Sequence, residues 1–122
     1  MKIYFIRFRC IPLLCVGAVF TRDELRRLVA LAREHDSWLV CDQTYHEFLF
    51  DGASHVFPCS KEFDYPKIVH IFSFSKAFGM PGWRVGYAVY PQLLSDSFRK
   101  VSRYFLMRRI LIALSSSSRC VE

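Results

Sequence analysis

Residues 73–87 read SFSKAFGMPGWRVGY and enclose one lysine, Lys76, in small, aromatic and turn-forming residues. An ordinary surface lysine has charged or polar neighbours and lies within a helical or strand period, whereas this one has neither. A lysine must lose its proton before it can act as a nucleophile. An apolar wall of Phe74, Phe78 and Trp83 would disfavour the ammonium form, so Lys76 is a candidate nucleophile.

Ser73 and Arg84 flank this lysine at positions suited to binding an anion. An arginine presents a planar fork of donors that matches a phosphate group, and a serine hydroxyl can donate to the same group. A nucleophilic amine beside a phosphate clamp suggests the cofactor pyridoxal 5'-phosphate, bound to Lys76 as a Schiff base. The alternative interpretation is a buried turn that contains an incidental lysine.

The spacing Ser-x-x-Lys followed by Gly-x-x-Gly-x-Arg-x-Gly resembles the lysine segment of the class I and II aminotransferases, which are fold-type-I pyridoxal-phosphate enzymes. In that family the lysine forms the Schiff base, and the arginine and the first serine bind the cofactor phosphate. The resemblance implies these roles for Lys76, Arg84 and Ser73. It covers about residues 17–103 and is of the aspartate or aromatic aminotransferase type.

Asp42 and Tyr45 form a second motif, directly after an apolar run at 37–42. Such a run predicts a strand that is buried on both faces, as in a parallel sheet covered by helices. In open α/β sheets, ligands bind beyond the carboxyl ends of the strands, so an acid at this point is a functional candidate. The Asp-x-x-Tyr pattern is similar to the family's cofactor-ring contacts. It implies that Asp42 pairs with the ring nitrogen and Tyr45 with the phenolic oxygen; a carboxylate that only caps the next turn is the alternative.

Hydrophobic periodicity predicts the elements around these motifs. In chain order they are a helix over 21–36 opened by a Thr21–Glu24 capping box, strands over 37–42, 67–72 and 84–90, and a helix from Pro91. Because only residues 73–83 join the second and third strands, those strands should be antiparallel if they are adjacent. The expected fold class is α/β. It would be a fragment of the pyridoxal-phosphate-transferase large domain, with a mostly parallel sheet, helices and one antiparallel strand after the lysine loop.

The composition narrows the class of protein. The chain has 122 residues, 52% of them hydrophobic, and a net charge of +6. A full enzyme of the resembled family is several times longer, so we expect a central fragment that leaves apolar surface uncovered. The charge fits a solvated basic face, because no nucleic-acid-binding motif accompanies it. The apolar stretch 11–19 is too short to cross a bilayer, so no membrane partner is expected.

The cysteines and histidines favour neither disulfides nor a metal. The five cysteines are odd in number and lack a C-x-x-C pair, and reduced thiols fit a cytoplasmic or organellar protein. His46, Glu47 and His55 lack metal-ligand spacing, so we expect ordinary polar positions and no metal. Residues 1–16 are expected to be a divergent N-terminal segment and 106–122 a divergent or disordered tail, on either side of a partial large domain at 17–105.

The resemblance implies transfer of an amino group between an amino acid and a 2-oxo acid, in a family whose members form homodimers. The family's small-residue phosphate loop and its C-terminal domain have no counterpart here, so little turnover is expected from this chain by itself. Two alternatives stay open. One is another fold-type-I reaction, such as the lyase chemistry of aminocyclopropane-carboxylate synthase. The other is a non-catalytic, truncated subunit that associates with a full-length partner.

Overall fold

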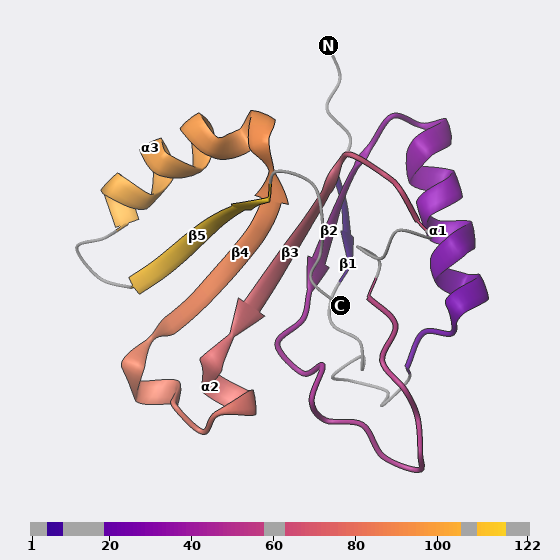
Figure 1. Cartoon of the computed structure of the whole chain (residues 1–122), viewed down its shortest axis with the longest axis horizontal. Coiled ribbons are helices and arrows are strands. Elements are labelled where there is room, and N and C mark those ends of the chain that lie inside the picture. The colour runs from indigo at the N-terminus through magenta and orange to yellow at the C-terminus, as the bar shows by residue number, and fades with distance from the viewer. Residues whose placement is uncertain (1–4, 9–18, 58–62, 106–109, 117–122) are drawn as a thin grey trace.

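A computed structural model describes residues 5–8, 19–57, 63–105 and 110–116, of which 5–8, 102–105 and 110–116 are described by their backbone only. The described part is one sheet with a helix on each face (Figure 1). In chain order the elements are β1 (Phe5–Phe8), α1 (Arg22–Glu34), β2 (Trp38–Asp42), β3 (Ile68–Ser73), α2 (Phe74–Ala77), the 3-10 helix η1 (Pro81–Trp83), β4 (Val85–Pro91), the 3-10 helix η2 (Gln92–Leu94), α3 (Ser95–Phe105) and β5 (Ile110–Ser116).

The sheet has the strand order β1-β2-β3-β4-β5. Strands β1, β2 and β3 are mutually parallel, β4 runs antiparallel to β3, and β5 is parallel to β4. A connection as short as the one between β3 and β4 cannot return the chain to the start of a parallel neighbour, so the reversal follows from its length. The predicted α/β class, with one antiparallel reversal after the lysine segment, is confirmed.

Helix α1 begins where the sequence predicted. Thr21 Oγ1 accepts a hydrogen bond from the Glu24 amide at 3.3 Å, and the Glu24 carboxylate accepts one from the Thr21 amide at 2.8 Å. These bonds satisfy two amides that the helix itself leaves without partners, and they hold the pKa of Glu24 below its usual value. The capping box is therefore confirmed.

Two apolar clusters attach the helices to opposite faces of the sheet. On one face α1 packs against β2 and β3 through a cluster whose buried members are Leu25, Val29, Leu39, Cys41, Phe63 and Ile68. On the other face, Leu94 and Phe98 pack against Val69, Ala88 and Tyr90, with the rings of Tyr90 and Phe98 stacked at 4.0 Å. Alternate residues of β2 point to the two clusters, as the period of a strand requires.

Three details differ from the predictions. Lys76 lies on a one-turn helix, α2, and not in an irregular loop. The helix expected from Pro91 is split into η2 and α3. Strand β5 lies within 106–122, so the expectation of disorder is wrong for Ile110–Ser116. Its seven residues pair with β4, a long-range contact that local composition does not reveal. The divergence of the two terminal segments stays a prediction.

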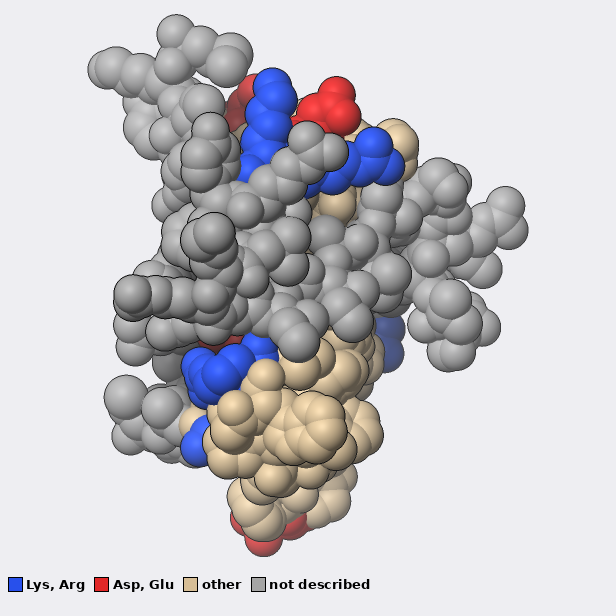
Figure 2. Space-filling model, turned by 90° about the vertical axis from the view of Figure 1, so that its left-hand side faces the viewer, with Lys and Arg blue, Asp and Glu red and all other residues tan. Residues whose placement is uncertain are grey.

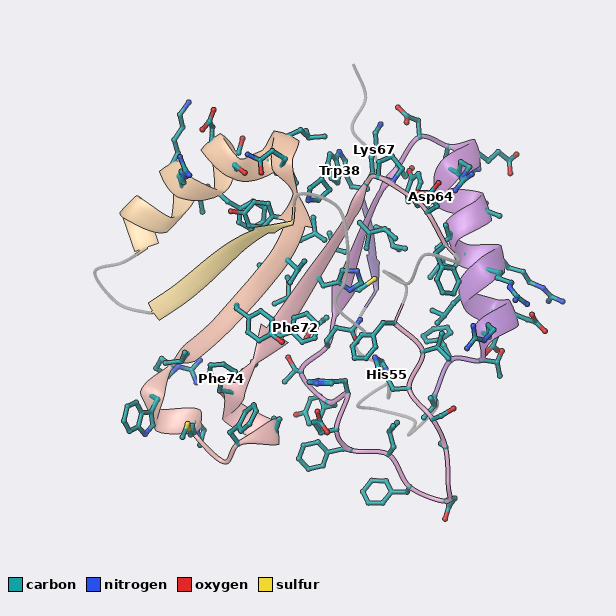
Figure 3. All side chains as sticks on the ribbon, in the orientation of Figure 1. Trp38, His55, Asp64, Lys67, Phe72 and Phe74 are labelled. Atoms are coloured by element: carbon teal, nitrogen blue, oxygen red, sulfur yellow. The ribbon has the colours of Figure 1, made fainter. Side chains whose placement is uncertain are left out.

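A hydrogen bond joins the C-terminal end of α1 to the segment that leads into β3. The hydroxyl of Tyr65 lies 2.9 Å from the carbonyl oxygen of Ala32 and 2.5 Å from that of Ser37. Nearby, the Arg33 guanidinium donates to the carbonyl of Asp64 at 2.9 Å. Asp64 and Lys67 lie beside this end of the helix (Figure 3). These contacts fix α1 against the sheet at the end opposite to α2.

We expect Tyr65→Phe to lower the free energy of unfolding by about 1–2 kcal/mol, because the carbonyls of Ala32 and Ser37 lose their shared donor while the ring stays in place. Urea denaturation followed by circular dichroism measures the change. Tyr90→Phe is the matched control: its ring is buried, and no hydrogen bond of its hydroxyl is found in the described part of the chain. Equal stability losses in the two variants would contradict this account.

Candidate active site

Three segments that carry predicted site residues meet at one edge of the sheet. Strands β2 and β3 are parallel, so Asp42 and Ser73 end their strands on the same side, and β4 starts from that side (Figure 1). Within the sheet Asp42 pairs with Ile71, and Ser73 pairs with Gly86. We call this edge, with the turn after β2, α2 and η1, the site edge.

Asp42 is half-buried at the end of β2. Its Oδ1 accepts hydrogen bonds from the amide of Thr44 at 3.1 Å and from the Thr44 hydroxyl at 2.6 Å. A carboxylate that bonds the backbone two residues onward forms an Asx turn, which fixes the direction in which the chain leaves the strand. The turn carries Tyr45, whose ring packs edge-on against Phe48 at 5.9 Å.

Lys76 and Tyr45 lie together, although they come from different strand ends. The ammonium nitrogen of Lys76 is 5.8 Å from the centre of the Tyr45 ring, within the range of a cation–π contact. The side chain of Lys76 is exposed. The structure therefore brings the predicted nucleophile to the motif that follows β2.

The apolar wall expected around Lys76 is only partly formed. Phe74 is half-buried and packs against Phe78 at 5.1 Å and Tyr87 at 5.8 Å. By contrast, Phe78 is 63% exposed and Trp83 is 72% exposed. The expectation of a closed wall is wrong for these two rings, because they lie on the surface of the described chain instead of over the amine.

Ser73 and Arg84 both make local contacts. Ser73 is the N-cap of α2, and its Oγ accepts from the Ser75 amide at 3.2 Å. Arg84 adopts the left-handed backbone conformation, with φ of 56°, and its Nη1 donates to the Pro81 carbonyl at 3.0 Å. A left-handed non-glycine residue carries a conformational cost and is enriched at functional sites. Both residues occupy the site edge, one before α2 and one after η1.

The sequence did not predict that three polar residues near the site edge are packed against the sheet. Gln43 is fully buried and His70 is 3% exposed, and the Gln43 amide nitrogen lies 3.4 Å from His70 Nδ1. His55 projects from its loop toward the sheet (Figure 3), where its ring meets Phe57 edge-on at 4.2 Å. A polar residue next to an apolar run gives no sign of whether it is buried, so the sequence held no signal for this packing.

Burial lowers the pKa of His70 to about 4 and that of His55 to about 4. Charge repulsion from His46 adds to the effect on His55, and Glu47 opposes it. Among the described residues, no acceptor or donor contacts His70 Nε2 or either ring nitrogen of His55, and His70 Nδ1 faces the amide nitrogen of Gln43, so an added proton would gain no hydrogen bond.

We therefore expect the protein to lose stability as the pH falls. In an unfolded chain a histidine titrates near pH 6.5, whereas in the folded chain these two titrate lower. The unfolded state thus binds more protons between about pH 6.5 and 4, and the free energy of unfolding falls through that window, by on the order of 3 kcal/mol for His70. Thermal unfolding at a series of pH values measures the slope.

The His70→Phe variant should flatten that slope, whereas His35→Gln, which changes an exposed histidine, should leave it unchanged. A wild-type slope that is flat between pH 4 and 6.5 would contradict the expectation.

The sequence matches the family described as aminotransferase class I and II over residues 15–118. It is 43% identical to the aromatic aminotransferase ISS1 of Arabidopsis thaliana over 82 residues, which are 67% of this chain and 19% of that protein. The chain belongs to the class I and II aminotransferase family, which is a family of enzymes whose cofactor is pyridoxal 5'-phosphate.

Two solved structures share the fold. An aspartate aminotransferase of Thermus thermophilus matches with a TM-score of 0.74 and 33% identity, over 83% of this chain and 27% of that one. A C-S lyase of Staphylococcus hominis, solved with pyridoxal phosphate bound, matches with a TM-score of 0.60 and 31% identity, over 66% of this chain and 20% of that one. The chain thus spans about a quarter or less of the length of the relatives that it matches. Within the ranges described, no helix is both long and apolar enough to cross a membrane.

The donor set at the site edge fits pyridoxal 5'-phosphate. A primary amine, Lys76, suits the aldehyde, and a guanidinium and a hydroxyl, Arg84 and Ser73, suit the phosphate. The carboxylate of Asp42 suits a protonated ring nitrogen, and the phenol of Tyr45 suits the ring oxygen. All five positions belong to segments that start or end at the same edge of the sheet.

Proposed function

We propose that this chain is the cofactor-binding part of an aminotransferase that moves an amino group between an amino acid and a 2-oxo acid. The observation that carries the proposal is the position of Lys76 beside Tyr45, with Asp42 and Ser73 at neighbouring strand ends. In this account Lys76 binds the cofactor covalently, and Asp42, Tyr45, Ser73 and Arg84 hold it in place.

Each residue has one task. Arg84 and Ser73 neutralise and anchor the phosphate, and the carboxylate of Asp42 keeps the ring nitrogen protonated. When bound, pyridoxal 5'-phosphate supplies an electron sink for the bond being broken at the substrate α-carbon. The amine of Lys76 would act as the general base that accepts the proton from that α-carbon.

A lyase reaction at the same lysine is the second candidate, and the likeness to the Staphylococcus hominis C-S lyase favours it. The two reactions differ in the fate of the nitrogen. Amino-group transfer would release a 2-oxo acid without ammonia, whereas elimination would release ammonia together with a 2-oxo acid. The third candidate, a truncated subunit without activity, predicts neither product.

The test is a single-turnover assay. The chain is loaded with pyridoxal 5'-phosphate and mixed with an equal amount of aspartate, tyrosine, phenylalanine or a cysteine thioether, whose C–S bond supplies the leaving group for a lyase. The 2-oxo acid and ammonia are both measured. We expect up to one equivalent of 2-oxo acid, no ammonia, and little steady-state turnover. Ammonia would support the lyase, and the absence of both products from a loaded chain would overturn the proposal of amino-group transfer.

We also propose a subunit contact at the site edge. Large exposed apolar side chains lie in or beside its segments, namely Phe48, Phe78, Met80 and Trp83, with Phe50 a few residues beyond the turn. Figure 2 shows largely uncharged surface in the lower part of the molecule, with lysine or arginine side chains along its upper border and acidic side chains at its lowest tip. A patch of this kind usually marks an interface, and a second copy is the occupant that the homodimers of the family suggest. Sedimentation should show a dimer at micromolar concentration; a monomer at all concentrations would remove this part of the proposal.

We also propose that the protein works in a reducing, cytoplasmic compartment. The thiol of Cys41 supports this, because it is free and buried. Burial raises its pKa to about 12. Thiol counts on denatured protein, with and without reductant, should agree. A lower count without reductant would indicate a disulfide and an oxidising compartment.

A further inference from the structure

Gln43 is the only residue at the site edge, within the described ranges, that is fully buried and carries a polar side chain. It directly follows Asp42 and lies two residues before Tyr45. Burying an amide is unfavourable unless the amide is hydrogen-bonded, and an apolar residue would fill this place at lower cost. The polar side chain therefore indicates a requirement other than packing.

The backbone of Gln43 connects two parts of the site edge. Its amide donates to the Ile71 carbonyl at 2.7 Å, which continues the β2–β3 pairing one residue beyond β2. Its carbonyl accepts from the ring nitrogen Nδ1 of His46 at 2.6 Å, which closes the turn that carries Tyr45. Gln43 thus has one bond to the strand that leads to Lys76 and another to the turn after Asp42.

The side chain of Gln43 adds a third connection. Its Nε2 is a donor and lies 3.4 Å from His70 Nδ1, so His70 accepts there and carries its proton on Nε2. His70 pairs in the sheet with Cys41, one residue before Asp42, and lies three residues before Ser73. The contact therefore joins the end of β2 to β3 close to both halves of the proposed cofactor site.

We propose that Gln43 and His70 are positioning residues that hold the turn carrying Asp42 and Tyr45 in register with the strand carrying Ser73 and Lys76. In this proposal the pair acts through the position of the turn and not by contact with substrate or cofactor. Its effect is to restrict the movement of the turn after β2 relative to α2. The approach of Tyr45 to Lys76 depends on the relative position of these two segments. The importance of that approach for catalysis rests on the proposed function, whereas the order of the turn can be measured without cofactor.

A double-mutant cycle in the 122-residue chain tests the pair. Gln43→Met keeps the length of the side chain, His70→Phe keeps an aromatic ring, and the double variant removes both polar groups. Amide hydrogen exchange is measured at Thr44, His46 and Phe48 in the turn. Leu25 and Leu39, whose amides bond at the start of α1 and in β2, serve as internal controls.

We expect each single variant to speed exchange in the turn by roughly fivefold, the order expected for the loss of one buried hydrogen bond. The double variant should regain much of the thermal stability, since no buried polar group is left without a partner, yet exchange in the turn should stay fast. If the pair only supported packing, the double variant would recover wild-type thermal stability and wild-type exchange in the turn together. If exchange in the turn matches wild type in both single variants, or recovers with stability in the double variant, the proposal is wrong.

Cofactor capture separates this inference from the proposed function. Borohydride reduction after incubation with pyridoxal 5'-phosphate should place a pyridoxyl group on Lys76 in wild type and less of it in Gln43→Met. No adduct on wild-type Lys76 would overturn the proposed function and leave the exchange result standing. Equal adduct in wild type and Gln43→Met would show that the pair does not position the cofactor site.

Discussion

Replacing Lys76 by arginine is expected to abolish covalent capture of pyridoxal 5'-phosphate. Arginine keeps the positive charge and a similar length, but its guanidinium stays protonated at any usable pH and does not attack an aldehyde. The readout is the intact mass of the chain after incubation with cofactor and borohydride reduction. We expect one pyridoxyl group per wild-type chain and none on the variant.

Lys100→Arg is the matched control, because Lys100 is an exposed lysine on α3, away from the site edge. It should capture as much cofactor as wild type. Both variants should keep wild-type stability within about 0.5 kcal/mol, since both side chains are exposed. Equal capture by the Lys76 variant and wild type would show that another amine binds the cofactor.

Replacing Gly86 by alanine is expected to be strongly destabilising. A Cβ atom at this position would lie 2.5 Å from the carbonyl oxygen of Phe72 and 3.6 Å from the Cα of Ser73. These are backbone atoms of the neighbouring strand, so β3 or β4 must move. Overpacking of this kind costs about 3 kcal/mol. The movement would occur where Ser73 leads into the helix of Lys76, so cofactor capture should fall as well.

Gly82→Ala is the matched control for Gly86, because a Cβ atom there has nothing within 4 Å. It should leave the urea midpoint of unfolding unchanged or slightly raised, since alanine restricts the unfolded chain more than glycine does. A Gly86→Ala variant as stable as Gly82→Ala would mean that β3 and β4 do not approach as closely as described.

The parts of the fold that depend on neighbouring residues could be predicted from the sequence. The Thr21–Glu24 capping box predicts the start of α1, and the short connection between β3 and β4 predicts their antiparallel pairing. Both are local effects, in which the residues that decide the structure lie a few positions apart.

The parts that depend on distant contacts could not be predicted. The burial of Gln43 and His70 requires the pairing of β2 with β3, and no local pattern distinguishes a buried amide from an exposed one. The exposure of Phe78 and Trp83 has the same origin, because an aromatic residue looks apolar in sequence wherever it lies. Strand β5 pairs with β4, and the local composition of residues 110–116 does not predict that pairing. The roles of the five predicted site residues stay a proposal.

A crystal structure of the chain soaked with pyridoxal 5'-phosphate tests the central claim most directly. We predict continuous electron density from the Lys76 amine to the cofactor, the phosphate between Ser73 and Arg84, and the ring nitrogen beside the carboxylate of Asp42. Cofactor bound at another lysine, or at Lys76 with its phosphate and ring away from those residues, would contradict the account.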